Sequence, residues 1–220
     1  MSTVSELSDM SEELADSRSA KRLRLWYLVI VISVAAILGF SMLSVLLYRQ
    51  MQDYHDAKYR SQYVIVGDIS TYAQVVDSDV VTMTNTSITL NDRAIAGTSA
   101  VNDLRYLSSL VRAIREMYLA DSEKNDTFYT LGQAVDTLGM NAETVYDNLL
   151  RNLTDGIPML EYPALNAKLQ TAAALVGSLS QVLDAGFKEG VDFEKHPYSI
   201  VNNLDLVSIR SISVSVINAF

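Results

Sequence analysis

The 220-residue chain has no cysteine, only two histidines and only three prolines. Without cysteine, it has no disulfide, no Cys-ligated zinc or iron–sulfur site, no thiol nucleophile and no lipid-anchor cysteine. The histidines, His55 and His196, are far apart and lie in no metal-ligand or catalytic spacing. We therefore expect no catalytic residues, no metal site and no cofactor.

Phosphate-binding and calcium-binding motifs are incomplete. The glycines at 186–190 have neither the Walker nor the Rossmann spacing and suit the end of a helix. Asp121, Glu123 and Asn125 place oxygen ligands at alternate positions, as a calcium loop does. The glycine of the sharp turn and the final bidentate glutamate are missing, so residues 121–126 are interpreted as a solvated polar loop between helices.

Positive charge is scarce. The formal net charge is −9, and residues 49–220 alone carry thirteen Lys and Arg against twenty-one Asp and Glu, which gives 13 − 21 = −8. Such a surface repels phosphate backbones and anionic lipid headgroups. Nucleic acid is therefore not expected as a partner.

One long uncharged run stands out against this background. The 24 residues from Leu25 to Tyr48 include no charged side chain, and as a helix they would extend roughly 36 Å, enough to cross a hydrocarbon layer of about 30 Å. Trp26, Tyr27 and Tyr48 lie near its ends, where aromatic belts form. A cleaved signal peptide is the main alternative, but its apolar core is usually about 7–15 residues and ends in a small-residue cleavage site. We predict a retained signal-anchor helix at 25–48.

Basic residues predict its orientation. Four Lys or Arg lie within 18–24, whereas the nearest three on the other side are spread over 49–60. The more basic flank stays in the cytoplasm, so we expect a cytoplasmic N-terminus and an extracytoplasmic C-terminal domain at the cell membrane. Residues 1–24 are rich in Ser, Asp and Glu and are interpreted as a disordered tail with a basic flank.

The remaining sequence predicts an all-α domain. Apolar residues recur at steps of three and four over 65–83, 101–118, 131–152 and 165–183. Gly156 and Pro158 end the third stripe, and Pro163 suits the first turn of the fourth helix. We predict that residues 49–190 form an antiparallel four-helix bundle, whose first helix continues without a break from the membrane span.

The pattern leaves two alternatives open. Either Thr98 or Ser99 is the N-cap of the second helix, or this helix extends backwards through 88–97 with a kink at Gly97. Residues 191–220 form a further helix or strand on the bundle. The spacing of Leu204, Val207, Ser211, Val214 and Ile217 favours a fifth helix, although alternation over 207–216 also fits a strand.

Candidate surface sites are few. Three N-glycosylation sequons begin at Asn85, Asn125 and Asn152, in predicted loops or helix ends. An aromatic patch just outside the predicted span fits a partner protein and lipid headgroups equally well; it consists of Tyr54, Tyr59 and Tyr63.

Charged residues on the predicted helices are interpreted mainly as solvated. Arg105 and Arg112 fall beyond the core edge, whereas Arg115 takes a flanking position that can meet a neighbouring helix. Asn152 is the one polar residue on a core stripe.

The layout of tail, single span and four-helix extracytoplasmic bundle resembles the front half of a bacterial or archaeal chemoreceptor. The resemblance rests on layout and periodicity, without a second span or cytoplasmic signalling helices, and transfers no ligand-binding residue. It implies a ligand-sensing bundle without its own output domain as an alternative function. An enzyme using carboxylates such as Asp136, Glu143 and Asp147 would need a concave pocket. The main hypothesis is a non-catalytic, membrane-anchored scaffold subunit that binds the bilayer and other membrane or envelope proteins, or a second copy of itself.

Overall fold

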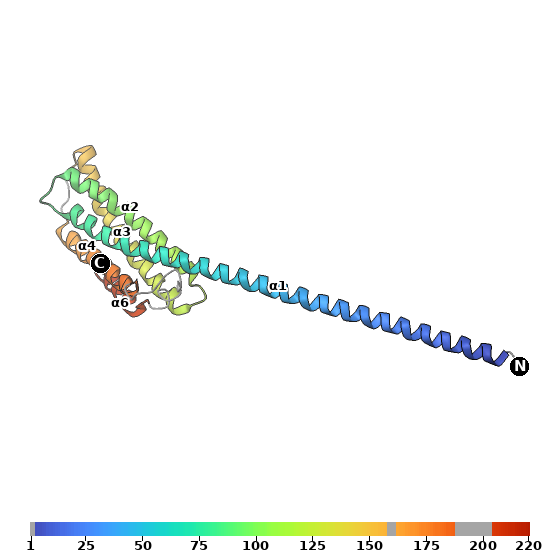
Figure 1. The fold of residues 1–220 in the computed structure, drawn as a ribbon. Helices are drawn as coiled ribbons and strands as arrows, with labels where there is room; N and C mark the ends of the chain where they lie inside the picture. Colours follow the sequence, from blue (N-terminus) through green and yellow to red (C-terminus); the bar gives the residue numbers. More distant parts are fainter. Residues whose placement is uncertain (1–2, 158–161, 188–203) are drawn as a thin grey trace. The chain divides into compact units, whose positions relative to one another are not determined.

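The computed structural model describes residues 3–157, 162–187 and 204–220. Within these ranges the chain forms five helices and no strand (Figure 1), which confirms the all-α prediction. Contacts divide the chain into two compact units, Met1–His55 and Asp56–Phe220. The second is called the packed unit below. Pro158, Gly190 and His196 lie outside the described residues.

Helix α1, Thr3–Thr84, runs through both units and confirms the predicted continuity between the apolar run and the following helix. In the first unit every side chain of residues 25–48 is exposed. By length and composition, this is the one described helix able to cross a membrane, and it fits a membrane anchor or a signal sequence. Residues 3–24, expected to be disordered, are helical here. No glycine or proline interrupts them, and extending an existing helix costs far less than nucleating one.

Helix α2, Leu90–Met117, starts earlier than the predicted caps at Thr98 and Ser99. Its N-cap is Thr89, whose Oγ1 accepts a hydrogen bond from the backbone N–H of Asp92 at 3.2 Å. The alternative of a helix extending backwards through residue 90 is therefore the right one, and Thr98 and Ser99 lie inside it.

Helix α3, Ser122–Asp155, replaces the predicted loop at 121–126. The Asp121 carboxylate caps it, accepting from the Lys124 backbone N–H at 3.2 Å, so the oxygen-rich pattern marks a helix start instead of an interhelix loop. Gly156 ends α3 in the left-handed conformation at φ 65°, as expected of a glycine after a helix. Asn152 is half-buried and donates to the Ile157 carbonyl at 2.8 Å, so it closes the helix end and does not add a polar group to the core.

Helix α4, Pro163–Phe187, begins at the predicted proline. The C-terminal segment forms helix α6, Leu206–Asn218, and not the alternative strand. The expected buried face of α6 is wrong, because Val207 is 77% exposed whereas Ile209, Ser213 and Val216 are buried.

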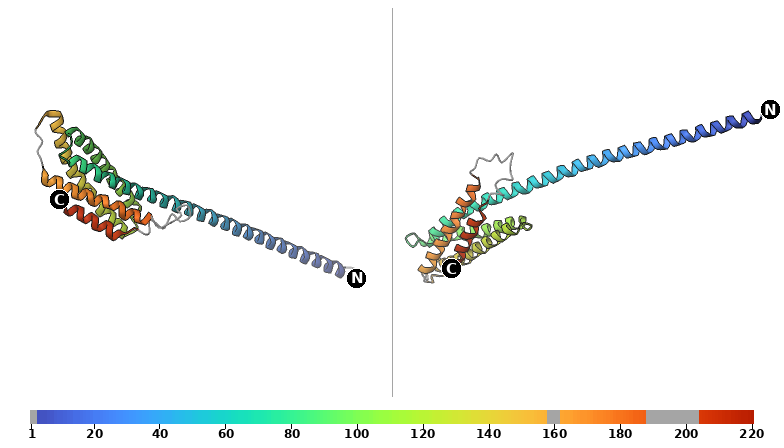
Figure 2. Two further views of the ribbon diagram at one scale, coloured as in Figure 1. Left: turned by 60° about the vertical axis from the view of Figure 1, so that its left-hand side comes forward. Right: turned by 90° about the horizontal axis from the view of Figure 1, so that it is seen from below.

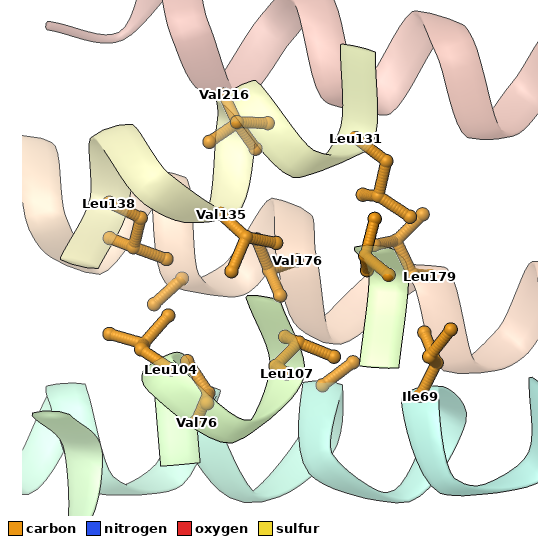
Figure 3. Close-up of a cluster of buried hydrophobic side chains, with 14 of the residues drawn as sticks. Ile69, Val76, Leu104, Leu107, Leu131, Val135, Leu138, Val176, Leu179 and Val216 are labelled. Atoms are coloured by element: carbon orange, nitrogen blue, oxygen red, sulfur yellow. The ribbon is translucent and has the colours of Figure 1, made fainter. Parts of the chain in front are cut away.

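The packed unit has one apolar core built from all five helices. Ile69 and Val76 of α1, Leu104 and Leu107 of α2, and Val176 and Leu179 of α4 converge in it (Figure 3), together with α3 and α6 residues. Most of these side chains belong to the four predicted apolar stripes, so the stripes are confirmed. Asn152 is the exception, because it is not part of the core.

Helices α1 and α4 run antiparallel in the packed unit. Along α1 and α4, hydrogen bonds join Ser70 to Asp184, Gln74 to Ser180 and Thr84 to Gln170, so residue numbers rise on one helix as they fall on the other. Helix α6 packs against both α3 and α4 and lies beside α4 in both views of Figure 2. A fifth helix thus covers apolar surface that α3 and α4 leave between them.

Candidate functional site

Helices α2 and α3 are joined by charged pairs on their outer face. Arg105 Nη2 lies 2.8 Å from Glu143 Oε1, and Arg112 Nη2 lies 3.1 Å from Asp136 Oδ2. Ser108 Oγ also donates to Asp136 at 2.6 Å. The arginines are exposed as predicted, but each reaches across to the neighbouring helix. Two of the carboxylates considered for catalysis therefore hold interhelical ion pairs.

A hollow of about 770 Å³ runs along this face between the paired charges. Its floor is apolar and is formed by Leu104, Ala113, Val135 and Gly139, with Met140 at the edge. Met140 is 63% exposed, whereas Leu104 and Val135 belong to the buried core. We call this feature the α2–α3 groove.

Arg115 meets the neighbouring helix, as its register predicted. Its Nε donates to Asn125 Oδ1 at 2.9 Å, and its guanidinium carbon lies 4.6 Å from the centre of the Tyr129 ring. Arg115 therefore ties the end of α2 to the start of α3.

A second hollow, of about 300 Å³, lies at the end of the packed unit where α2 passes into α3. We call it the polar cavity. Helix α1 contributes three of its lining residues, and the rest come from the end of α2, the connecting turn and the first turn of α3. The lining residues are Lys58, Tyr59, Gln62, Met117, Tyr118, Ala120, Asp121 and Lys124.

Two lining side chains have polar atoms that are buried without a hydrogen-bond partner. Gln62 is 1% exposed and Tyr118 5% exposed. Gln62 Oε1 and the Tyr118 hydroxyl find no partner among the described residues. Leaving a buried polar atom unsatisfied costs about 1–3 kcal/mol, and both atoms have less than 1 Å² of accessible surface, so neither is open to a solute in the polar cavity.

Charge at the polar cavity is locally positive. Lys58 and Lys124 line the cavity together with one carboxylate, Asp121, whose Oδ2 lies 3.2 Å from Lys124 Nζ. Lys124 Nζ also lies 5.1 Å from the Tyr118 ring centre. Burial, then the charge of Asp121, raises the pKa of the Tyr118 hydroxyl well above its usual range. Tyr118 is therefore a neutral phenol that can donate a hydrogen bond at any physiological pH.

A pair of acids joins α1 to α2 elsewhere in the unit. Burial, followed by the charge of Asp103 and a hydrogen bond between the two carboxyl groups, raises the pKa of Asp79. Both side chains are half-buried. Two carboxylates at such a site resist ionising together.

The three sequons occupy different settings. Asn85 is exposed in the turn after α1, where its Oδ1 accepts from the Ser87 backbone N–H at 2.9 Å. Asn125 is half-buried in the first turns of α3, and Thr127 of its sequon is 1% exposed. The side-chain N–H of Asn152 donates a hydrogen bond to a backbone carbonyl. Of the three, only Asn85 is presented on an exposed turn.

The three tyrosines of the predicted aromatic patch do not share one setting. Tyr54 belongs to the first unit and is 69% exposed, with its ring edge-on to His55 at 6.2 Å. Tyr59 and Tyr63 belong to the packed unit and are half-buried, and Tyr59 packs against the core and lines the polar cavity.

Sequence reasoning missed Gln62. The core stripe of α1, read backwards from Ile69 and Val66 at helical steps, reaches Gln62 and Tyr59. A glutamine on an apolar stripe indicates a buried polar group, and the spacing that places Gln62 on this stripe can be read from the sequence.

The described residues include no group of three or more His, Asp or Glu placed to hold a metal ion. Comparison with known proteins adds no relative: no family model, no curated protein and no solved structure matches this chain.

Proposed function

We propose that this chain is a non-catalytic, membrane-anchored interaction subunit. Residues 25–48 anchor it in a cell membrane, with the N-terminus in the cytoplasm and the packed unit outside. Two observations support this placement: every side chain of that run is exposed in the protein alone, and basic residues are denser before it than after it.

The proposal of partner binding rests on the α2–α3 groove. An apolar floor bordered by fixed charges is the surface that an amphipathic helix of a partner recognises, with apolar anchors on the floor and polar groups at the rim. The pairs of Arg105 with Glu143 and of Arg112 with Asp136 each join the α2 side of the groove to its α3 side. The partner we propose is such a helix from another membrane or envelope protein.

Site-specific photo-crosslinking in native membranes tests this function. A photoreactive residue at Met140, on the edge of the groove, should form one major adduct with a neighbouring protein. The same residue at Val207, which is more exposed but lies on α6, should not. An adduct with a second copy would identify the partner as this chain itself. Equal labelling at the two positions, or none at Met140, would contradict the proposal.

Protease treatment of sealed, right-side-out vesicles tests the orientation separately. External protease should remove the packed unit and leave a protected fragment that contains residues 1–48. Protection of the packed unit would place it in the cytoplasm instead.

A further inference from the structure

The turn between α1 and α2 presents its sequon in a form that a glycosyl-transferring enzyme can bind. Asn85, Thr86 and Ser87 are all exposed and lie outside both helices. The Ser87 backbone N–H donates to Asn85 Oδ1 at 2.9 Å. This contact uses only the carbonyl oxygen of the side-chain amide, so it does not occupy the nitrogen that would carry a glycan.

The sequon at Asn125 is held inside the start of α3. The Asn125 backbone N–H donates to the Asp121 carbonyl at 2.9 Å, and Asn125 Oδ1 accepts from Arg115 Nε at 2.9 Å. The third residue, Thr127, is 1% exposed, and its hydroxyl donates to the Glu123 carbonyl at 2.9 Å. Because the enzyme recognises both the asparagine and the hydroxyl residue, it would have to unwind the first turns of α3.

The sequon at Asn152 is occupied at the reacting atom itself. Asn152 Nδ2 donates to the Ile157 carbonyl at 2.8 Å, and the Thr154 hydroxyl donates to the Leu150 carbonyl at 2.9 Å. A glycan added before folding would also interfere, because it would replace an N–H on the nitrogen that closes the end of α3. The fold therefore disfavours modification at Asn152 at either stage.

We propose that Asn85 is N-glycosylated and that Asn125 and Asn152 are not. The inference rests on the proposed function, because sequons are modified on the extracytoplasmic side of a membrane. The donor is a lipid-linked oligosaccharide phosphate. A bond forms between Asn85 Nδ2 and the anomeric carbon of the sugar while the bond from that carbon to the phosphate oxygen breaks. The amide nitrogen loses one proton, and the lipid phosphate leaves.

The attachment point is separate from the α2–α3 groove. The groove begins on α2 at Leu104, roughly four helical turns beyond Leu90, the first residue of that helix. A bulky, solvated glycan is thus attached at the α1–α2 turn, outside the proposed docking surface.

Mass spectrometry of the protein purified from its own membrane tests the modification. The peptide that contains Asn85 should carry a glycan, which a peptide N-glycosidase removes, leaving an aspartate at that position. The peptides that contain Asn125 and Asn152 should be unmodified. An unmodified Asn85 peptide, or a glycan on either of the other two asparagines, would overturn the proposal.

Variants of the full chain, translated with microsomes that contain the transferase, assign the acceptor. Asn85→Gln and Ser87→Ala should both abolish the glycosidase-sensitive mobility shift on a gel, because each removes an essential residue of the sequon. Thr86→Ala is the matched control and should keep the shift, since the middle position accepts most residues. All three side chains are exposed, so these substitutions should leave the fold intact. A shift that survives Asn85→Gln would assign the glycan elsewhere and overturn the proposal.

A second sequon, in a flexible tail added after Phe220, separates this inference from the proposed function. If the packed unit is outside, the tail is modified in every variant, Asn85→Gln included. A modified tail on a chain with unmodified Asn85 would overturn glycosylation at Asn85 and leave the orientation intact. If neither site were modified, the packed unit would be cytoplasmic, and both proposals would fail.

Discussion

Gly177 of α4 lies directly against Asp77 of α1. A Cβ placed on Gly177 would lie 3.0 Å from both the Cβ and the Oδ2 of Asp77. The contact falls within the antiparallel register that Ser70–Asp184 and Gln74–Ser180 define. At this point only hydrogen fits between the α4 backbone and α1, so the glycine sets how closely the two helices approach.

Gly177→Ala should therefore destabilise the packed unit by about 1–3 kcal/mol, as overpacking of a tight contact does. The reason is that Asp77 Cβ is attached to the α1 backbone and cannot move aside by a rotamer change. Urea unfolding of the full chain in detergent, followed by circular dichroism, measures the change.

Gly67→Ala is the matched control. Gly67 is also helical, but a Cβ there would meet nothing within 4 Å. Replacing it should stabilise the protein by about 0.5–1 kcal/mol through helix propensity alone. Equal effects of the two alanines would show that α1 and α4 are not in close contact at Gly177.

Thr89→Ala should cost about 1 kcal/mol, because it removes the side-chain oxygen that accepts from the Asp92 backbone N–H. Ser99→Ala is the control, since Ser99 lies exposed inside α2, where alanine is at least as favourable. The free energies of unfolding of the two variants are compared. If α2 began after Ser99 instead of after Thr89, Ser99→Ala would be the more destabilising variant.

The Asp79–Asp103 pair should make stability depend on pH. Because the pKa of Asp79 is raised in the folded state, the folded protein binds this proton more tightly than the unfolded chain. Its contribution is therefore fully present below the unfolded pKa of about 4 and is lost as pH rises through the folded pKa. Asp79→Asn should raise the unfolding temperature at neutral pH and reduce this part of the pH dependence.

Asp205→Asn serves as the comparison for that experiment. Hydrogen bonds from Ser208 lower the pKa of Asp205, so its contribution has the opposite sign and is lost as pH falls through the folded pKa. Asparagine is also a good N-cap, so neutral-pH stability should change little. An Asp79→Asn variant less stable than the parent at neutral pH would show that the two acids do not repel each other.

Met140→Glu should leave stability within about 0.5 kcal/mol of the parent, because the side chain is 63% exposed. Under the proposed function it should sharply reduce the amount of crosslinked partner, since docking would bury an unpaired charge at the edge of the groove. Val207→Glu, on the exposed side of α6, controls for added negative charge. Undiminished crosslinking in Met140→Glu would remove the α2–α3 groove as the docking surface.

Much of the helical core could be predicted because its pattern is local. Stripes such as Leu104, Leu107, Val111 and Ile114 need only helical spacing to be recognised, and they are buried. The first residue of a helix was harder to predict. Thr89, Thr98 and Ser99 are all chemically suitable caps, and the choice depends on where α2 must begin to reach Met83, whose carbonyl accepts from Arg93 Nε at 2.9 Å.

The candidate sites were mostly beyond prediction because they join residues distant in sequence. Lys58 and Gln62 share a cavity with Tyr118 and Lys124, and no spacing rule relates the two pairs. The buried face of α6 was missed for a similar reason. Its apolar residues fit more than one stripe, and contact with α3 and α4 selects Ile209 and Val216.

Three properties follow from the residues alone: the chain is helical, one uncharged run of 24 residues is long enough to cross a bilayer, and the first four helices each have a definite apolar face. These properties depend on composition and on periodicity along a single helix. The tertiary structure decided which polar residues meet, because charge pairs, orphaned atoms and cavities depend on the register between helices. That register is set by side-chain packing such as the contact of Gly177 with Asp77.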